Sequence, residues 1–291
     1  VSGSSLIPLE RIVAENPRVW FQAYLPSVGE KLDALLNRVQ AAGVSTLVVT
    51  VDSPVGSNRE NNLRSGFSTP LRPSLRLAWD GLVRPRWLFG TFLRTLLTDG
   101  VPHFENLYAY RGAPIISRTV QREFAGRAHF TWEHFKQVRA AWNGRLLVKG
   151  VLHPADATLA VAAGADGLIV SCHGGRQLDA AVAPLHVLPL ICEAAGTVPV
   201  MIDSGIRRGT DVVKALALGA KFVFVGRPFN YAAAVAGEEG AAYAASILKS
   251  EVVRSLAQIG ARRVVAIDPR QVVPRGILAG GPYAGGIKGG P

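Results

Sequence analysis

Short apolar segments rich in β-branched residues alternate with longer amphipathic segments, and this alternation is the strongest constraint on the fold. The strand-like segments are Trp20–Tyr24, Thr46–Val51, Leu146–Lys149, Leu168–Ser171, Val198–Asp203 and Phe222–Gly226. Helix-like segments lie between most of them, at Glu30–Ala42, Trp132–Trp142, Ala155–Ala163, Pro184–Ala194 and Asp211–Leu218. Strands that alternate with helices predict an α/β fold with a parallel sheet.

Polar residues stand at the carboxyl ends of several predicted strands, namely Gln22, Tyr24, Asp52, Lys149, His173 and Asp203. This pattern is typical of a (β/α)8 (TIM) barrel, which carries its active site on that face. Such a barrel has eight strands, whereas six are counted here. Val1–Ser2 resembles the tail of another strand, and the only methionine is Met201. We therefore expect a barrel whose first β/α unit and most of the second lie outside this sequence.

Length and composition are compatible with one large domain. The chain has 291 residues, of which 48% are hydrophobic, so it can bury a sizeable core. We expect the barrel to occupy residues 1–274, with an insertion at 68–112. The tail at 275–291 has seven glycines and two prolines, which predicts flexibility.

The basic charge points to anionic partners other than nucleic acid. The net charge is +11, but lysines and arginines are spread along the chain without the basic-aromatic arrays typical of a protein that binds single-stranded nucleic acid. An anionic membrane surface, or an anionic cofactor and substrate, accounts for this charge better.

Cysteine use and hydropathy indicate the compartment. Cys172 and Cys192 form neither a CxxC pair nor a disulfide framework, which fits a reducing environment. No signal peptide and no bilayer-spanning apolar run are recognised, so we expect a soluble or peripheral protein. No metal site is predicted.

The insertion combines arginines with large apolar residues. Ser68–Gly100 carries five arginines and no lysine, interleaved with aromatic residues such as Trp79, Trp87 and Phe89. This composition is typical of an interfacial membrane anchor. A lid or a packed helical excursion is the alternative.

The segment Ser171–Asp179 sets a histidine and an arginine three positions apart, directly after the apolar run Gly167–Val170. The strand end would deliver His173 and Arg176 to the active-site face. An isolated histidine of this kind is more often structural, but the other polar strand ends favour a functional role.

Two glycine-arginine neighbourhoods follow the last two strands. Asp203–Gly209 contains Gly205 and Arg207, and Gly226 is followed by Arg227. Loops after the final two strands of such barrels commonly bind phosphate through main-chain amides and cations. Arginines near helix starts oppose the helix dipole unless an anion is present.

On these residues the chain resembles the FMN-dependent 2-hydroxy-acid oxidases and dehydrogenases, of the L-lactate dehydrogenase, (S)-mandelate dehydrogenase and glycolate oxidase type. The resemblance runs from Val1 to about Val273. The motifs that carry it are Ser171–Asp179, Asp203–Asp211, Lys214–Gly219 and Val148–Gly150.

The resemblance implies roles on the substrate side. His173 would be the base that deprotonates the 2-hydroxy acid while a hydride or its equivalent passes to flavin N5. Asp52 would stabilise the resulting imidazolium. Arg176 would hold the substrate carboxylate, assisted by Tyr24 and Arg59.

The resemblance also implies FMN as cofactor. Lys149 would stabilise the negative charge of the reduced flavin. Ser2, Gln22 and Thr50 would contact the ring, Asp203 and Arg207 the ribityl and phosphate region, and Gly226 with Arg227 the phosphate. Ser171 and Gly205 complete the set of residues implied to bind FMN. Gln22 and Thr50 could instead be ordinary polar strand residues, and Lys149 a lysine that extends to solvent.

Two residues depart from the family pattern. Cys172 stands where the family usually has asparagine, which would loosen a local hydrogen bond. Ser204 replaces a commoner glycine, at little expected cost. The larger departure is that the N-terminal barrel region is expected to lie outside this sequence. In the family, that region supplies a further substrate-binding tyrosine.

The expected activity is oxidation of an L-2-hydroxy acid, lactate-like or mandelate-like, to the 2-oxo acid. The basic-aromatic insertion resembles that of the membrane-associated dehydrogenases, which favours quinone or another respiratory carrier as acceptor. We thus expect a peripheral protein on the inner face of the cell membrane, with a homotetramer implied by relatives. Alternatives are an oxidase that uses dioxygen, another phosphate-binding barrel enzyme, or an inactive flavin-binding or membrane-docking fragment.

Overall fold

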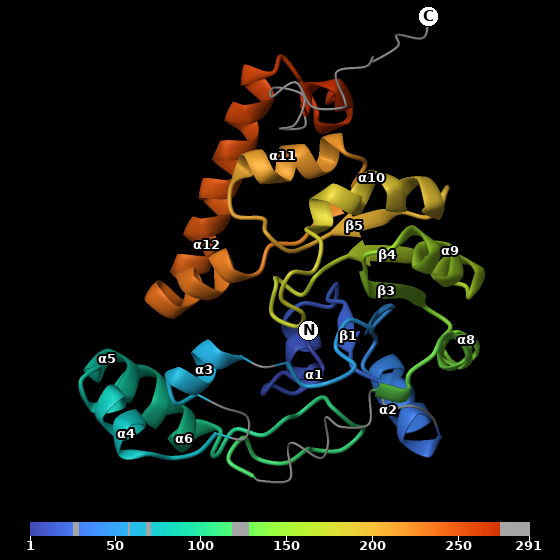
Figure 1. Cartoon of the computed structure of the whole chain (residues 1–291). Coiled ribbons are helices and arrows are strands. Elements are labelled where there is room, and N and C mark those ends of the chain that lie inside the picture. Colours follow the sequence, from blue (N-terminus) through green and yellow to red (C-terminus); the bar gives the residue numbers. More distant parts are fainter. Residues whose placement is uncertain (26–28, 58, 68–70, 118–127, 274–291) are drawn as a thin grey trace, which may run out of the picture.

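The computed structural model describes residues 1–25, 29–57, 59–67, 71–117 and 128–273 (Figure 1). Its centre is a parallel sheet with strand order β1-β2-β3-β4-β5-β6. The strands are β1 (Phe21–Ala23), β2 (Thr46–Thr50), β3 (Arg145–Val151), β4 (Gly167–Val170), β5 (Val200–Ile202) and β6 (Phe222–Val223). All six predicted strands are confirmed, each within a few residues of its expected bounds.

The helices predicted between the strands are also present. They are α2 (Glu30–Ala41), α8 (Trp132–Ala141), α9 (Pro154–Ala162), α10 (Pro184–Ala195) and α11 (Gly209–Ala217). Each turns a few apolar residues toward the sheet, as α2 does with Leu32, Leu35 and Leu36. The predicted α/β fold is therefore confirmed for the described part of the chain.

The sheet has two differently packed faces. Residues that alternate along β2 separate cleanly, because Leu47 and Val49 join the large core under the helices while Val48 does not. Val48 packs instead with Leu147, Ile169 and Met201 from the next three strands. This second cluster forms an inner layer of the kind found inside β/α barrels.

The two ends of the strand order approach each other across that inner layer. The Trp20 ring, just before β1, lies 6.3 Å from the Phe222 ring and 5.7 Å from the Phe224 ring. Ser2 makes a parallel bridge to Gln22, so the first residues extend the sheet beyond β1. This agrees with the interpretation of Val1–Ser2 as the end of a strand. The sheet is thus curled rather than flat.

The insertion folds into short helices that contact one another more than the sheet. They are α4 (Leu75–Leu82), α5 (Pro85–Trp87), the π-helical η1 (Leu88–Leu93) and α6 (Arg94–Thr98), and they lie to one side with α3 (Glu60–Arg64) (Figure 1). Leu75 is 92% exposed and Leu97 85% exposed. Within the described residues, no helix has the length and apolarity needed to cross a bilayer.

Several elements were not predicted from the sequence. The largest is α12 (Arg227–Gln258), in which Ala236 and Gly237 leave helical geometry. The others are α1 (Leu9–Glu15), α3, and the 3-10 turns η3 (Val264–Ala266) and η4 (Pro269–Gln271). The predicted tail at 275–291 lies outside the described residues, as do residues 68–70 of the insertion. The predicted domain boundaries stay predictions.

Helix α12 packs closely on α11 at a glycine. A Cβ added to Gly209 would lie 2.5 Å from the Glu251 main chain. The Gly209 amide donates to Glu251 Oε2 at 2.7 Å, and Arg208 Nη2 lies 2.6 Å from Glu251 Oε1. The start of α11 is therefore joined to α12 by close packing and hydrogen bonding.

We predict that Gly209→Ala destabilises the protein by about 1–3 kcal/mol, because helices α11 and α12 must separate to admit the methyl group. Gly90→Ala is the matched control, since nothing lies within 4 Å of its added Cβ. It should leave stability unchanged or slightly raised. Urea denaturation midpoints measure both. Equal midpoints for the two variants would contradict the close α11–α12 contact.

Candidate functional site

The loop after β4 presents His173 in a strained conformation. His173 has a φ of +55°, a left-handed value that is uncommon for residues other than glycine. Its amide donates to Ser171 Oγ at 3.0 Å, and the Gly175 amide donates to the Cys172 carbonyl at 3.0 Å. Such strained residues often mark functional sites.

The imidazole of His173 is oriented by a carboxylate from a different strand end. His173 Nδ1 lies 3.0 Å from Oδ1 of Asp52, which follows β2. The two side chains are 20% and 10% exposed. A carboxylate at Nδ1 accepts a hydrogen bond from the proton-bearing edge of the ring and leaves Nε2 as the acceptor. The predicted base and its partner are therefore placed together.

Gly150 makes room for this pair. A Cβ on Gly150 would lie 2.6 Å from Asp52 Cβ, so a larger residue would displace the carboxylate. Ser53 adds a hydroxyl that donates to Asp52 Oδ1 at 3.2 Å and lies 3.5 Å from His173 Nδ1. Asp52 Oδ2 is buried and has no hydrogen-bond partner among the described residues. Ser53 was not predicted as a site residue.

The Nε2 edge of the His173 imidazole lies beside a tyrosine. Tyr24 Oη lies 3.4 Å from His173 Nε2, and the two rings are 6.4 Å apart. Tyr24 follows β1, so the cluster joins the ends of β1, β2 and β4. A reacting hydroxyl near Nε2 would also be near this phenol.

Two guanidinium groups stand close to this cluster. Burial, together with the positive charge of Arg176, lowers the pKa of Arg59. Arg59 Nη2 donates to Gln177 Oε1 at 3.2 Å, which ties Arg59 to the loop that carries Arg176. Among the described residues, neither guanidinium forms an ion pair with a carboxylate. Two neighbouring guanidinium groups that have no carboxylate partner among the described residues favour the binding of an anionic ligand.

Lys149 lies on the inner side of the site, where it is paired. Its Nζ lies 3.0 Å from Asp203 Oδ2 and donates to Ser171 Oγ at 2.8 Å. The Lys149 and Asp203 side chains are 17% and 21% exposed. A lysine that extends into solvent is therefore ruled out at this position. The same contacts place Asp203 beside Lys149 and Ser171.

The ends of the first strands supply a polar row. Gln22 Nε2 donates to Thr50 Oγ1 at 2.8 Å, and Ser2 Oγ donates to Gln22 Oε1 at 2.9 Å. These three side chains lie together, and their predicted contact with the flavin ring stays a prediction. Their amide and hydroxyl groups are suited to the nitrogen and oxygen edge of a heterocycle.

The predicted phosphate residues occupy the loops after β5 and β6. Gly205 is exposed at a φ of +78°, and Gly226 is exposed directly before α12, whose first turn has no side-chain cap. Arg227 Nη2 donates to the Gly174 carbonyl at 2.9 Å, so this arginine also contacts the His173 loop. Arg207 has a 78% exposed side chain, 3.9 Å from Asp211. No contact joins Arg207 to the other predicted site residues in the described part.

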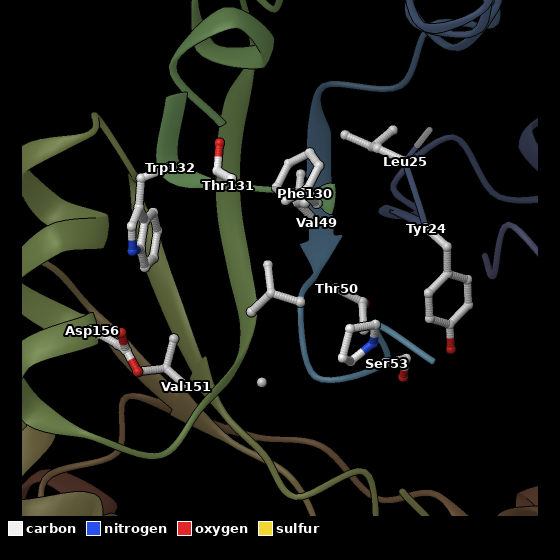
Figure 2. A pocket seen from close by; sticks show the side chains of 13 residues that line it. Tyr24, Leu25, Val49, Thr50, Ser53, Phe130, Thr131, Trp132, Val151 and Asp156 are labelled. Carbon is white, nitrogen blue, oxygen red and sulfur yellow. The ribbon is translucent and has the colours of Figure 1, made fainter. Parts of the chain in front are cut away.

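A cavity of about 440 Å³ is lined by Tyr24, Ser53 and Gly150, which contact Asp52 or His173, but not by Asp52 or His173 themselves. Figure 2 shows Tyr24, Thr50 and Ser53 on one side and Phe130, Thr131 and Trp132 on another. Asp156 and Val151 line the lower part in that view. The described residues that line this cavity include no lysine or arginine, and neither Arg59 nor Arg176 is among them.

Comparisons with known proteins identify the family to which the chain belongs. The family described as FMN-dependent dehydrogenase matches residues 1–274. The L-lactate dehydrogenase of Azorhizobium caulinodans is 39% identical over 282 residues, which cover 94% of this chain and 72% of that protein. The (S)-mandelate dehydrogenase of Pseudomonas putida is 38% identical over 259 residues, which cover 89% of this chain and 64% of that protein.

Solved structures share the fold. The crystal structure of the monotopic membrane protein (S)-mandelate dehydrogenase has a TM-score of 0.80 and 35% identity, covering 92% of this chain and 70% of that chain. A mandelate oxidase variant with (S)-mandelic acid has a TM-score of 0.70 and 33% identity, covering 92% of this chain and 67% of that chain. With its His173–Asp52 pair and its two neighbouring arginines, the chain belongs to the FMN-dependent dehydrogenases and is an enzyme of the 2-hydroxy-acid dehydrogenase type.

Proposed function

We propose that this protein oxidises an L-2-hydroxy acid to the 2-oxo acid, with FMN as cofactor and His173 as the base. The observation that carries the proposal is the 3.0 Å contact between His173 Nδ1 and Asp52 Oδ1. It leaves Nε2 facing Tyr24, in the neighbourhood of the two arginines. A base, a proton-sharing phenol and an anion site are what a hydroxy acid requires.

The substrate carboxylate would bind Arg176 and Arg59. A planar guanidinium presents two parallel N–H groups, which match the two oxygens of a carboxylate. An anion between the arginines would also relieve their mutual repulsion, which contributes to the lowered pKa of Arg59. This attachment would fix the substrate hydroxyl within reach of His173 Nε2.

Proton transfer would then end at His173 Nε2. The imidazolium that forms is stabilised by Asp52, whose carboxylate is 10% exposed and therefore weakly screened by solvent. Tyr24 Oη, 3.4 Å from Nε2, would donate to the substrate hydroxyl oxygen or hold it in place. Ser53 would keep the carboxylate turned toward Nδ1.

The donor set at the strand ends fits FMN. Gln22, Thr50, Ser2 and Ser171 offer amide and hydroxyl groups to a flavin ring, while Gly205, Arg207, Gly226 and Arg227 offer amides and cations to a phosphate. When bound, FMN supplies a two-electron acceptor for the substrate. Lys149 would stabilise the added negative charge, and Asp203 would hold the ammonium in place at 3.0 Å.

The strands fit a larger barrel. We infer that β1–β6 are strands three to eight of a (β/α)8 barrel, with Ser2 in the second. The parallel Ser2–Gln22 bridge and the approach of Trp20 to Phe222 support this interpretation. The substrate face would then be the carboxyl end of the barrel.

We also propose that helices α4–α6 lie on an anionic membrane on the cytoplasmic side, with a quinone or related carrier as electron acceptor. The exposed apolar residues of this region include Leu75, Trp79, Phe89 and Leu97, among arginines. One structural relative is described as a monotopic membrane protein. A membrane position would bring the enzyme close to lipid-soluble acceptors.

Loss of the base should abolish substrate oxidation without loss of the cofactor. We predict that His173→Gln still binds FMN but reduces it about 10²- to 10⁴-fold more slowly, because general base catalysis contributes a factor of this size. Anaerobic bleaching of flavin absorbance by L-lactate or L-mandelate provides the measurement. His186→Gln, at an exposed position on α10, is the control and should behave as wild type. Rapid bleaching of His173→Gln would assign the base elsewhere.

Membrane binding should depend on the apolar side chains of the insertion. We predict that the triple variant Trp79→Ser, Phe89→Ser, Leu97→Ser no longer sediments with phosphatidylglycerol vesicles, while flavin reduction by substrate is retained. The control Val235→Ser, Tyr243→Ser, Val265→Ser removes three comparably exposed residues elsewhere and should still sediment. If the two triple variants sediment equally, the anchor does not lie in this region.

A further inference from the structure

Ser204 occupies a backbone conformation that favours glycine. It follows Asp203 at the end of β5 and has a φ of +75°. Glycine would adopt this conformation without steric strain, whereas the Cβ of a serine lies too close to the backbone carbonyl oxygen. Strain of this kind persists where the surrounding structure compensates for it. The compensation here must come from the side chain.

The Ser204 hydroxyl makes three hydrogen bonds, which is all that a hydroxyl can form. It accepts from the Gly174 amide at 2.9 Å and from the Cys172 amide at 3.3 Å. It donates to Asp203 Oδ1 at 2.8 Å. Since a hydroxyl has one proton and two lone pairs, the contact with Asp203 turns both lone pairs toward the His173 loop.

These bonds enclose the backbone of His173 from both sides. The amides of residues 172 and 174 bind Ser204 Oγ, and the amide between them binds Ser171 Oγ at 3.0 Å. Ser171 Oγ in turn accepts from Lys149 Nζ, and Lys149 pairs with Asp203 Oδ2. Three consecutive amides of the strained loop are thus bound by two serines. One serine hydroxyl contacts Lys149 and the other contacts Asp203, the two partners of one ion pair.

We propose that Ser204 is a positioning residue that clamps the His173 loop to the Lys149–Asp203 pair and thereby fixes the imidazole against Asp52. This inference rests on the proposed function of His173. Ser204 does not touch the reacting groups and acts through the amides of Cys172 and Gly174. Its hydroxyl links the predicted flavin side of the site to the base.

The test compares three variants of the FMN-loaded protein. Ser204→Gly removes the hydroxyl and relieves the backbone strain. Ser204→Ala removes the hydroxyl and keeps the strain. Ala180→Gly is the matched control, because Ala180 is an exposed residue in the same loop region at a φ of +59° and has no hydroxyl.

The clamp predicts that activity and stability separate. Ser204→Gly should lose about tenfold or more in kcat at unchanged or raised Tm, since small displacements of a reacting group are costly. Ser204→Ala should lose a similar factor at lower Tm. Ala180→Gly should keep kcat within twofold. The isotope effect on kcat with 2-deuterated substrate should rise in both Ser204 variants, because the chemical step becomes rate-limiting.

A merely structural role for Ser204 gives a different result. Activity would then follow Tm, and Ser204→Gly would be as active as wild type, which would overturn the proposal. So would loss of activity in Ser204→Ala alone, because it would assign the effect to the backbone.

Hydrogen exchange of the amides at residues 172–174 tests the clamp independently of turnover. Both Ser204 variants should exchange these amides at least tenfold faster than wild type, and unchanged exchange would overturn the clamp. If no 2-hydroxy acid reduces the wild-type flavin, the proposed function fails instead, while the exchange result still decides whether Ser204 holds the loop.

Discussion

The contact between Asp52 and His173 is the interaction on which the site depends. It joins residues 121 positions apart, from the ends of β2 and β4, at 3.0 Å. A parallel sheet makes this possible, because the carboxyl ends of all its strands meet at one edge. The contact in turn requires Gly150 in β3, where an added Cβ would lie 2.6 Å from the carboxylate side chain. Three strands in register thus determine the orientation of one imidazole.

The second constraint is that two differently charged groups of side chains occupy separate positions within one small site. Lys149 and Asp203 form one partly buried pair on the inner side, while Arg59 and Arg176 stand together near Tyr24. Lys149 is paired with a carboxylate, whereas Arg59 and Arg176 have no carboxylate partner within the described residues. The ion pair with Asp203 fixes the position of the Lys149 ammonium. The two arginines carry excess positive charge, which an acid group would neutralise. In the proposed function, the first group would face a reduced ring and the second a substrate carboxylate.

Much of this organisation could be predicted from the sequence, because strand ends and apolar runs are local signals. The β2 and β4 strands are buried along their whole length and have apolar centres, and the residues that follow them fall at the site. Helix α12 was missed because its alanine-rich sequence lacks an apolar stripe and breaks at Ala236 and Gly237. The pairing of Asp203 with Lys149 and the bonds of Ser204 were also missed. They depend on side chains from different strands, whose distances no local pattern contains.

The helices α4, α5, η1 and α6 contact one another more than they contact the sheet, and this arrangement has a mechanical consequence. A group of helices with few ties to the main core can open at lower free energy than the whole protein. Apolar residues such as Leu75 and Leu97 are more than four-fifths exposed, so reorganising them costs little buried contact. These helices can therefore rearrange while the sheet keeps its geometry, and on the proposed membrane surface they would adjust to lipids of different packing. On the same proposal, substitutions in these helices would change membrane binding without changing the geometry around His173.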